Sequence, residues 1–146
     1  MPRAPDVEKL RKKKDVKGLI KALAYPGEAM VCVNAVKALG EIGDGRAIPQ
    51  LVAALDDQDP DVAWLAADAL RQFERAAWPS LLSRLIRDGP HSVQLRHRAH
   101  CVFWHQSADG YDDLLAALMS ALSSFTLPGS TAVAAYEVLH RLRAKG

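Results

Sequence analysis

The chain has 146 residues, of which 49% are hydrophobic and 25% charged, a composition typical of one soluble globular domain with a core. No apolar run approaches the roughly 20 residues of a membrane span, and no apolar signal segment follows the basic N-terminal residues. The formal net charge of +2 is too small to indicate nucleic-acid binding. Cys32 and Cys101 are too few for a disulfide framework, so we expect a cytoplasmic protein with reduced thiols and no membrane partner.

The first predicted element is a capping helix over residues 6–14, with Asp6 as its N-cap and with Val7 and Leu10 packed on the first repeat. The basic run 9–17 suits a nucleic acid or a membrane surface by its charge. It contains no interleaved aromatic residue, however. We therefore interpret it as the solvated outer face of the capping helix, and we expect no nucleic-acid partner.

Four leucine-rich segments then recur, and their starts are 32, 30 and 33 residues apart. The segments span residues 19–23, 51–55, 81–85 and 114–118. Each has apolar residues at positions i, i+1 and i+4, and another apolar residue three positions earlier, which is the stripe of an amphipathic helix. The earlier residues are Val16, Ile48, Trp78 and Tyr111. A proline-marked turn follows each segment, at Pro26, Pro60, Pro90 and Pro128. We predict that these segments are the first helices of four repeats.

A second helix is predicted in each repeat, with buried positions at i, i+3, i+4 and i+7. These positions are Ala35, Ala38, Leu39 and Ile42; Ala66, Ala69, Leu70 and Phe73; Ala99, Val102, Phe103 and Gln106; Ala135, Val138, Leu139 and Leu142. Asp59 and Pro60 are expected at the N-cap and N1 of the second of these helices. Gly43 is expected to end the first of them in a left-handed conformation. No strand-like alternation occurs, so the sequence predicts an all-α fold.

The segment "NAVKALGEIGDGRAIPQLVAAL", residues 34–55, carries a motif that is specific for a family. It resembles the HEAT repeats of the phycobilisome-lyase-like group, whose units read A-x-x-A-L-G-x-I-G-D followed by A-(V/I)-P-x-L-x-x-x-L. The resemblance is strong over residues 15–73 and decays where "FWHQSADG" replaces the glycine motif. It implies an α-solenoid of about four HEAT-like hairpins in a single domain, 1–146. The predicted repeats are 15–44, 45–75, 76–109 and 110–146.

The resemblance also implies that the second helices line a concave groove, and the helical period identifies the side chains that face it. We predict a partner-binding set of Trp64, Asp68, Arg71, His97, His100, Cys101, Trp104, Glu137 and His140. The same face includes Val33, Lys37, Ala67, Arg75, Val133 and Arg141. The predicted function is a non-enzymatic scaffold that binds a partner peptide or protein in the groove, with Trp64 and Trp104 as anchors. The alternative, that both indoles only pack between repeats, stays open.

The stretch "RHRAHCVFWH", residues 96–105, raises a metal site as a second hypothesis. His97, Cys101 and His105 are spaced i, i+4, i+8, so pairs of them share one helix face. The sequence contains no C-x-x-C or H-E-x-x-H motif that would provide further ligands. The His-Glu dipeptides by which related HEAT proteins hold two irons are absent as well. We therefore expect neither a metal nor another cofactor.

Two enzyme classes related to this repeat group remain as alternatives, although we predict no catalytic residue. One is a bilin-lyase-type subunit, for which no chromophore-handling residue is identified. The other resembles HEAT-like alkylpurine-DNA glycosylases, in which Trp64, Asp68 and Trp104, with Arg96 or Arg98, would form the site. The groove carries few cations to neutralise phosphates, which argues against this class. Whether the chain forms homo-oligomers or belongs to a larger assembly stays open.

Overall fold

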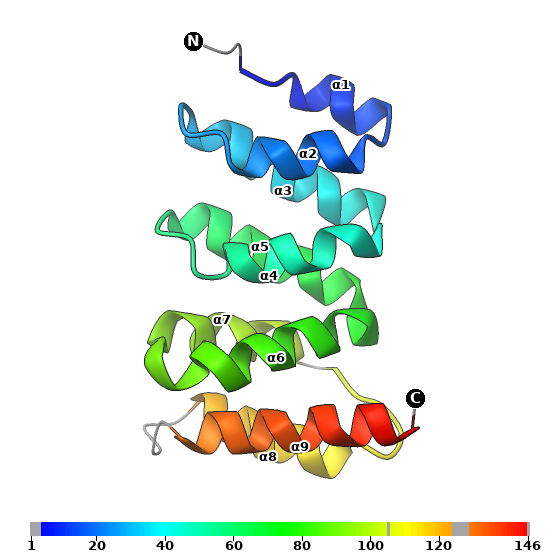
Figure 1. Ribbon diagram of the computed structural model, residues 1–146, viewed down its shortest axis with the longest axis vertical. Helices are drawn as coiled ribbons and strands as arrows, with labels where there is room; N and C mark the ends of the chain where they lie inside the picture. Colours follow the sequence, from blue (N-terminus) through cyan, green and yellow to red (C-terminus); the bar gives the residue numbers. More distant parts are fainter. Residues whose placement is uncertain (1–3, 105, 124–128, 146) are drawn as a thin grey trace. The chain divides into compact units, whose positions relative to one another are not determined.

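The computed structural model describes residues 4–104, 106–123 and 129–145. These residues form nine α-helices and three short 3₁₀ helices, with no strand among them, which confirms the predicted all-α class (Figure 1). The chain divides into two compact units, Met1–Phe73 and Glu74–Gly146. The α-helices are α1 (Val7–Lys12), α2 (Val16–Leu23), α3 (Ala29–Ile42), α4 (Ile48–Ala54), α5 (Pro60–Gln72), α6 (Trp78–Asp88), α7 (Val93–Phe103), α8 (Asp112–Ser123) and α9 (Gly129–Lys145). The 3₁₀ helices are η1 (Gly45–Ala47), η2 (Glu74–Ala77) and η3 (Gly89–His91).

Polar side chains fix where the helices begin. The Asp6 carboxylate accepts a hydrogen bond from the Lys9 amide at 3.1 Å, and Asp15 accepts one from the Gly18 amide at 2.9 Å. Asp59 caps α5 in the same way, and Pro60 follows it at the first helical position. These bonds satisfy amide groups that the first helical turn leaves without a backbone acceptor. The two caps predicted at Asp6 and Asp59 are therefore confirmed.

The end of α3 is fixed by backbone conformation. Gly43 has φ +72° and ψ +24°, and its amide donates to the carbonyl oxygen of Leu39 at 3.1 Å. This is the left-handed cap predicted for this glycine, because a residue without a Cβ adopts the conformation without steric cost. Glu74, one repeat later, also has a positive φ, +53°. The proline predicted to mark the last turn, Pro128, lies outside the described residues.

The first unit is a stack of two helical hairpins beneath a capping helix. Within it α2 packs on α3, α4 packs on α5, and the two second helices α3 and α5 pack on one another. Gly40 allows the closest approach, since a Cβ placed there would lie 2.9 Å from the Cβ of Ala69. Helix α1 packs on α2 and α3 with Val7 and Leu10 half-buried. The core is thus continuous from one hairpin to the next, as expected for stacked repeats.

The predicted buried stripe of the second helices is confirmed at three of its four positions. The residues at i, i+3 and i+4 are buried in α3, α5, α7 and α9. The residues at i+7 are only half-buried: Ile42, Phe73, Gln106 and Leu142. Three of them lie at or beyond the end of their helix, and Leu142 lies in the last turns of α9. They are less buried because fewer neighbouring side chains surround a helix end.

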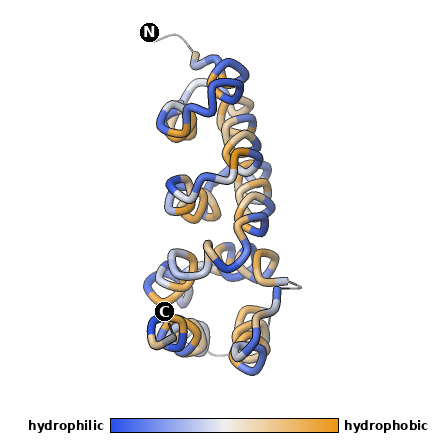
Figure 2. The backbone as a smooth tube through the Cα atoms, turned by 90° about the vertical axis from the view of Figure 1, so that its right-hand side faces the viewer, coloured by the Kyte–Doolittle hydropathy of each residue, from blue (hydrophilic) through white to orange (hydrophobic). Residues whose placement is uncertain are grey.

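The second unit departs from the predicted arrangement. A regular stack would place α8 on α6 and α9 on α7, but α9 packs against α6 and α8 packs against α7. Figure 1 shows α6 and α9 at the front of this unit with α7 and α8 behind, and Figure 2 shows the same four helices nearly end-on. The last hairpin is therefore reversed. Helix α9 does not lie beside α7, contrary to the expectation that all second helices form one layer.

The connection between α7 and α8 explains the reversal. Helix α7 ends at Phe103, and Trp104 leaves it in an extended conformation with ψ +127°, not through a left-handed glycine. Three buried aromatic rings hold the path: Trp78 lies 5.9 Å from Phe103 and 6.0 Å from Tyr111, between ring centroids. Arg75 lies over the Tyr111 ring at 4.7 Å and donates to its hydroxyl at 3.0 Å. This cluster places the start of α8 beside α7.

No helix among the described residues combines the length and the apolar character that crossing a membrane requires.

Candidate interaction surface

In the first unit, the exposed face of α5 carries three of the predicted partner-binding residues. Trp64, Asp68 and Arg71 follow one another at helical spacing; Trp64 is 46% exposed, Asp68 is exposed and Arg71 is half-buried. Lys37 on the neighbouring helix α3 is exposed as well. This surface combines one large apolar ring with charges of both signs. Partner-binding surfaces commonly have this character at an anchor residue.

The face is narrower than predicted, because Val33 and Ala67 are buried. Helix α3 packs on α2 and α5, and α5 packs on α3 and α4. A helix with neighbours on two sides exposes less than half of its circumference, whereas the prediction assigned the full half opposite the buried stripe.

In the second unit, the structure brings together the predicted residues of α7. His97 is exposed, His100 and Cys101 are half-buried, and Trp104 is 49% exposed just beyond the helix end. The rings of His100 and Trp104 lie 5.5 Å apart between centroids, with an interplanar angle of 30°. The indole of Trp104 therefore lies beside the ring of His100, and about half of the residue's surface is exposed.

Glu137 and His140 do not join this group. Both are exposed on α9, where the ring of His140 stacks on that of Tyr136 at 5.8 Å. Because α9 packs on α6 and α8, its exposed face belongs to the other helix layer of the unit. The expectation that these two residues line the same surface as His97 and His100 is wrong, and the reversed hairpin is the reason.

Arg141, also predicted on the groove face, is engaged in fixing the last hairpin. Its guanidinium donates to the carbonyl oxygen of Gly110 at 2.8 Å and to the carboxylate of Asp113 at 3.0 Å. This hydrogen bond lowers the pKa of Asp113 below its ordinary value. The pair ties the last turns of α9 to the start of α8.

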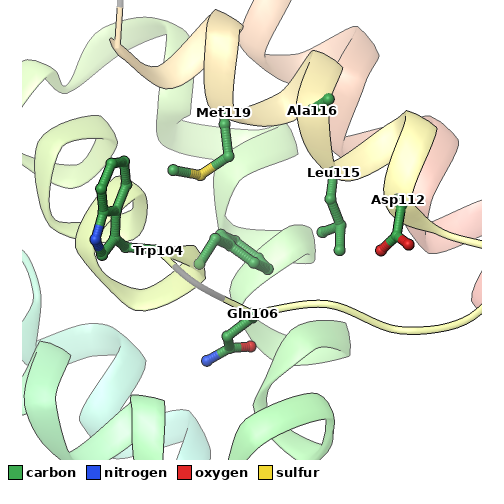
Figure 3. Close-up of a pocket in the computed structure, with 7 residues that line it drawn as sticks. Trp104, Gln106, Asp112, Leu115, Ala116 and Met119 are labelled. Atoms are coloured by element: carbon green, nitrogen blue, oxygen red, sulfur yellow. The ribbon is translucent and has the colours of Figure 1, made fainter.

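A pocket of about 300 Å³ lies between the end of α7 and one face of α8. Figure 3 shows Trp104 and Met119 at one end of it and Asp112 at the other. Phe103, Leu115, Ala116 and Gln106 complete the lining. The sequence prediction missed the α8 side of this pocket, because α8 was expected in the first-helix layer, away from Trp104. The signal was present in the sequence as Asp112, Leu115, Ala116 and Met119, which share one helix face.

The second hypothesis, a metal site, finds no ligand set in the described part of the chain, which holds no cluster of three or more His, Cys, Asp or Glu side chains. His105 lies outside the described residues. Cys32 is half-buried, and its thiol donates to the carbonyl oxygen of Leu23 at 3.2 Å. Burial raises the pKa of this thiol.

The two arginines of the glycosylase-like alternative have structural roles. The guanidinium of Arg96 donates to the carbonyl oxygen of Gly89 at 2.6 Å. Arg98 is buried on α7 and donates to the amide oxygen of Gln94 at 3.1 Å. Neither side chain extends from the α7 face that carries His97 and Cys101.

A family model for HEAT repeats matches residues 16–102, which is more than half of the chain. The match covers both hairpins of the first unit and ends within α7, before the reversed hairpin. No curated protein and no solved structure shows significant similarity to the chain.

Proposed function

The chain belongs to the HEAT-repeat family, and we propose that it acts as a protein-interaction module. HEAT repeats commonly mediate protein interactions, and their stacked helices offer long surfaces for this purpose. We propose that each unit offers its own surface for a partner peptide or protein: the exposed face of α5 in the first unit and the α7–α8 surface in the second. Trp64 is the anchor on the first surface, and Trp104 is the anchor on the second. We also propose that the protein acts in the cytoplasm. On the basis of the motif at residues 34–55, we propose that its repeats belong to the phycobilisome-lyase-like group.

The exposure of two tryptophans carries the proposal. Trp78 is 1% exposed and forms the centre of an aromatic cluster, whereas Trp64 and Trp104 are 46% and 49% exposed. Covering an indole ring with a partner removes a large apolar area from water, at roughly 25 cal/mol per Å². Tryptophan is also enriched among the residues that dominate binding energy at protein interfaces. Two half-exposed indoles are therefore better explained by a partner than by the core.

The enzyme alternatives receive less support. The glycosylase-like alternative assigned Arg96 or Arg98 to its site, but both arginines donate hydrogen bonds within the second unit. A lyase-type subunit needs residues that hold a chromophore, and the pocket at Trp104 is apolar on most of its surface. A binding role requires no further group. We propose no catalytic residue and no cofactor.

The experiment is capture of partners from a lysate of the source cell, with the wild-type chain and with Trp64→Ala, Trp104→Ala and the double variant as baits. Tyr136→Ala is the matched control, because Tyr136 is 57% exposed but lies on α9. We expect partners that the wild type and the control retain and that the double variant loses. Truncation of one anchor should weaken binding of the identified partner by about 2 kcal/mol, roughly thirtyfold. Equal capture by all baits, with unchanged melting temperatures, would refute the proposal.

A further inference from the structure

The pocket beside Trp104 is apolar at one end and acidic at the other. Phe103, which is buried, contributes to the lining, and Trp104 and Met119 form the apolar end. Asp112 lies at the opposite end, with its carboxylate on the exposed first turn of α8 (Figure 3). Asp112 and Met119 are seven residues apart on one helix face, a separation of about 10 Å along the axis. One short ligand segment therefore spans both ends.

Among the described residues, no basic side chain forms an ion pair with Asp112 at the acidic end. Asp113 is paired with Arg141, but Asp112 accepts only a long hydrogen bond, 3.4 Å, from the amide of Ala108. Asp109, in the same connection, is exposed and adds a second negative charge. A ligand that places an ammonium or guanidinium group here gains a charge-assisted hydrogen bond, whereas an acidic ligand is repelled.

The apolar end selects the other half of the ligand. An indole ring and a thioether sulfur both make favourable contacts with an aromatic ring, and the volume of about 300 Å³ is at the lower limit of ligand-binding clefts. One bulky side chain fills such a space. A polar side chain placed there loses its hydration without finding a partner, because the lining is mostly carbon.

We infer that the pocket binds a segment of the partner protein that carries an aromatic residue and, about two helical turns away, a Lys or Arg. The aromatic ring enters between Trp104 and Met119, and the basic side chain reaches Asp112. This inference rests on the proposed function, since it specifies the partner segment recognised at the Trp104 anchor. Charge complementarity identifies the occupant: a segment with a basic side chain matches Asp112, whereas an acidic segment does not.

The test uses the full chain and three short alanine-based peptides. The first carries Phe and, two helical turns away, Arg; the second replaces Arg by Glu; the third replaces Phe by Gly. Binding is followed by NMR chemical shifts of the Trp104 indole and the α8 amides at low salt. We expect the Phe–Arg peptide to bind at least about fivefold more tightly than the Phe–Glu peptide, as expected for an exposed ion pair plus removal of repulsion. The Phe-to-Gly peptide should shift neither set of signals.

Two variants locate the effect. Asp112→Asn should weaken the Phe–Arg peptide about two- to fivefold and leave the Phe–Glu peptide no weaker. Met119→Ala should weaken both peptides that contain Phe. Asp61→Asn is the matched control, because Asp61 is an exposed acid in the first turn of α5 and should change nothing.

Failure of this inference is distinguishable from failure of the proposed function. Equal binding of the Phe–Arg and Phe–Glu peptides, or an Asp112→Asn variant identical to wild type, would overturn the inference. The partners lost by the Trp104→Ala bait would then still support the interaction module. A dimer in sedimentation that Met119→Ala dissociates would also overturn it, since a second copy would occupy the pocket.

Discussion

A single left-handed residue ends α3 and turns the chain into the next hairpin. Gly43 has φ +72°, and nothing lies within 4 Å of the position that a Cβ would occupy. A substitution there consequently acts through the backbone alone. This separation of backbone strain from packing makes Gly43 a clean probe of the repeat connection.

We expect Gly43→Val to destabilise the fold by about 1–3 kcal/mol, because a β-branched residue is strained in the left-handed region. Urea unfolding measures the change. Gly43→Asn is the control, since asparagine tolerates this conformation and should cost less. If both variants unfold like the wild type, the cap does not contribute to stability in the way that its geometry indicates.

Residues whose roles are local were predictable from the sequence. The caps at Asp6 and Asp59 and the left-handed Gly43 depend on neighbours within a few positions, and all three are confirmed. Burial at the last stripe position was not predictable in the same way. The exposure of Phe73, for example, depends on where α5 ends, and helix ends are decided by competing caps and neighbours more than by periodicity.

The reversed hairpin is the main difference at the scale of elements. Periodicity identified a first and a second helix in the last repeat but could not say which neighbour each would meet. An apolar stripe fits any other apolar stripe of similar width. The choice was made by Trp78 in α6 and by Phe103 and Tyr111 on either side of the connection, whose ring contacts hold the crossing to α8. In the sequence, the missing glycine motif after α7 was the only visible sign.

Packing between η3 and α9 gives a direct test of the reversal. A Cβ on Gly89 would lie 3.0 Å from the Cγ2 methyl of Thr131, which is buried and donates to the carbonyl oxygen of Ala121 at 3.4 Å. We expect Gly89→Ala to be more harmful with Thr131 present than in a Thr131→Ser background, where the methyl is absent. A double-mutant cycle from urea unfolding should give a coupling of at least about 0.5 kcal/mol. Additive effects would contradict the contact and with it the position of α9.

The ion pair between α8 and α9 predicts a pH effect of known sign. Arg141 lowers the pKa of Asp113, so the pair's contribution to stability is complete above the unfolded-state pKa of about 3.9. That contribution is lost as the pH falls through the lower folded-state pKa. An NMR titration of the Asp113 carboxyl should give a midpoint below that of a model peptide. Arg141→Gln should return the midpoint to the ordinary value; if the midpoint is ordinary already in the wild type, the pair is absent in solution.

At the scale of the whole molecule, the all-α class followed from an apolar stripe that recurs four times, and the family followed from the motif of residues 34–55. The candidate site followed only in part. Trp64, Asp68 and Arg71 share one helix, on which Trp64 and Asp68 are exposed and Arg71 is half-buried, and their role in partner binding stays a prediction. The pocket at Trp104 was missed, since it forms only where α8 crosses to the side of α7. A surface formed by one helix can be predicted from the helical period of its sequence. A surface formed between helices can be predicted only when the tertiary arrangement of those helices is known.

Stability should not depend on a metal. The cores of the two units consist of aliphatic and aromatic side chains, and the described residues contain no cluster of three or more candidate ligands. We therefore expect that a chelator leaves the melting temperature unchanged, because a structural metal contributes its binding free energy to folding. A decrease of several degrees on chelation, reversed by adding zinc, would reinstate the hypothesis of a site at His97, Cys101 and His105.

We expect that the protein neither releases alkylated bases from DNA nor binds duplex DNA tightly at physiological salt. Each phosphate contact needs a cation, and few are available on the second helices. Lys37 is exposed and Arg71 half-buried, but Asp68 lies one turn from Arg71 on the same helix. Arg75 is held over Tyr111. A base-excision assay and a binding titration at several salt concentrations measure both expectations, with Asp68→Asn as the comparison.

The basic run 9–17 is expected to cause non-specific DNA binding in that titration. Its lysines lie on or next to α1 and at the start of α2, away from the α5 face, so weak association that falls steeply with added salt is expected from them and is unchanged in Asp68→Asn. Base release that disappears in Asp68→Asn is a different result, because it requires a carboxylate beside the reacting sugar. It would make the Trp64 and Asp68 face an active site and would refute the interaction module there. Absence of release, together with weaker partner binding by Trp64→Ala, leaves Asp68 as a residue that orients a protein ligand.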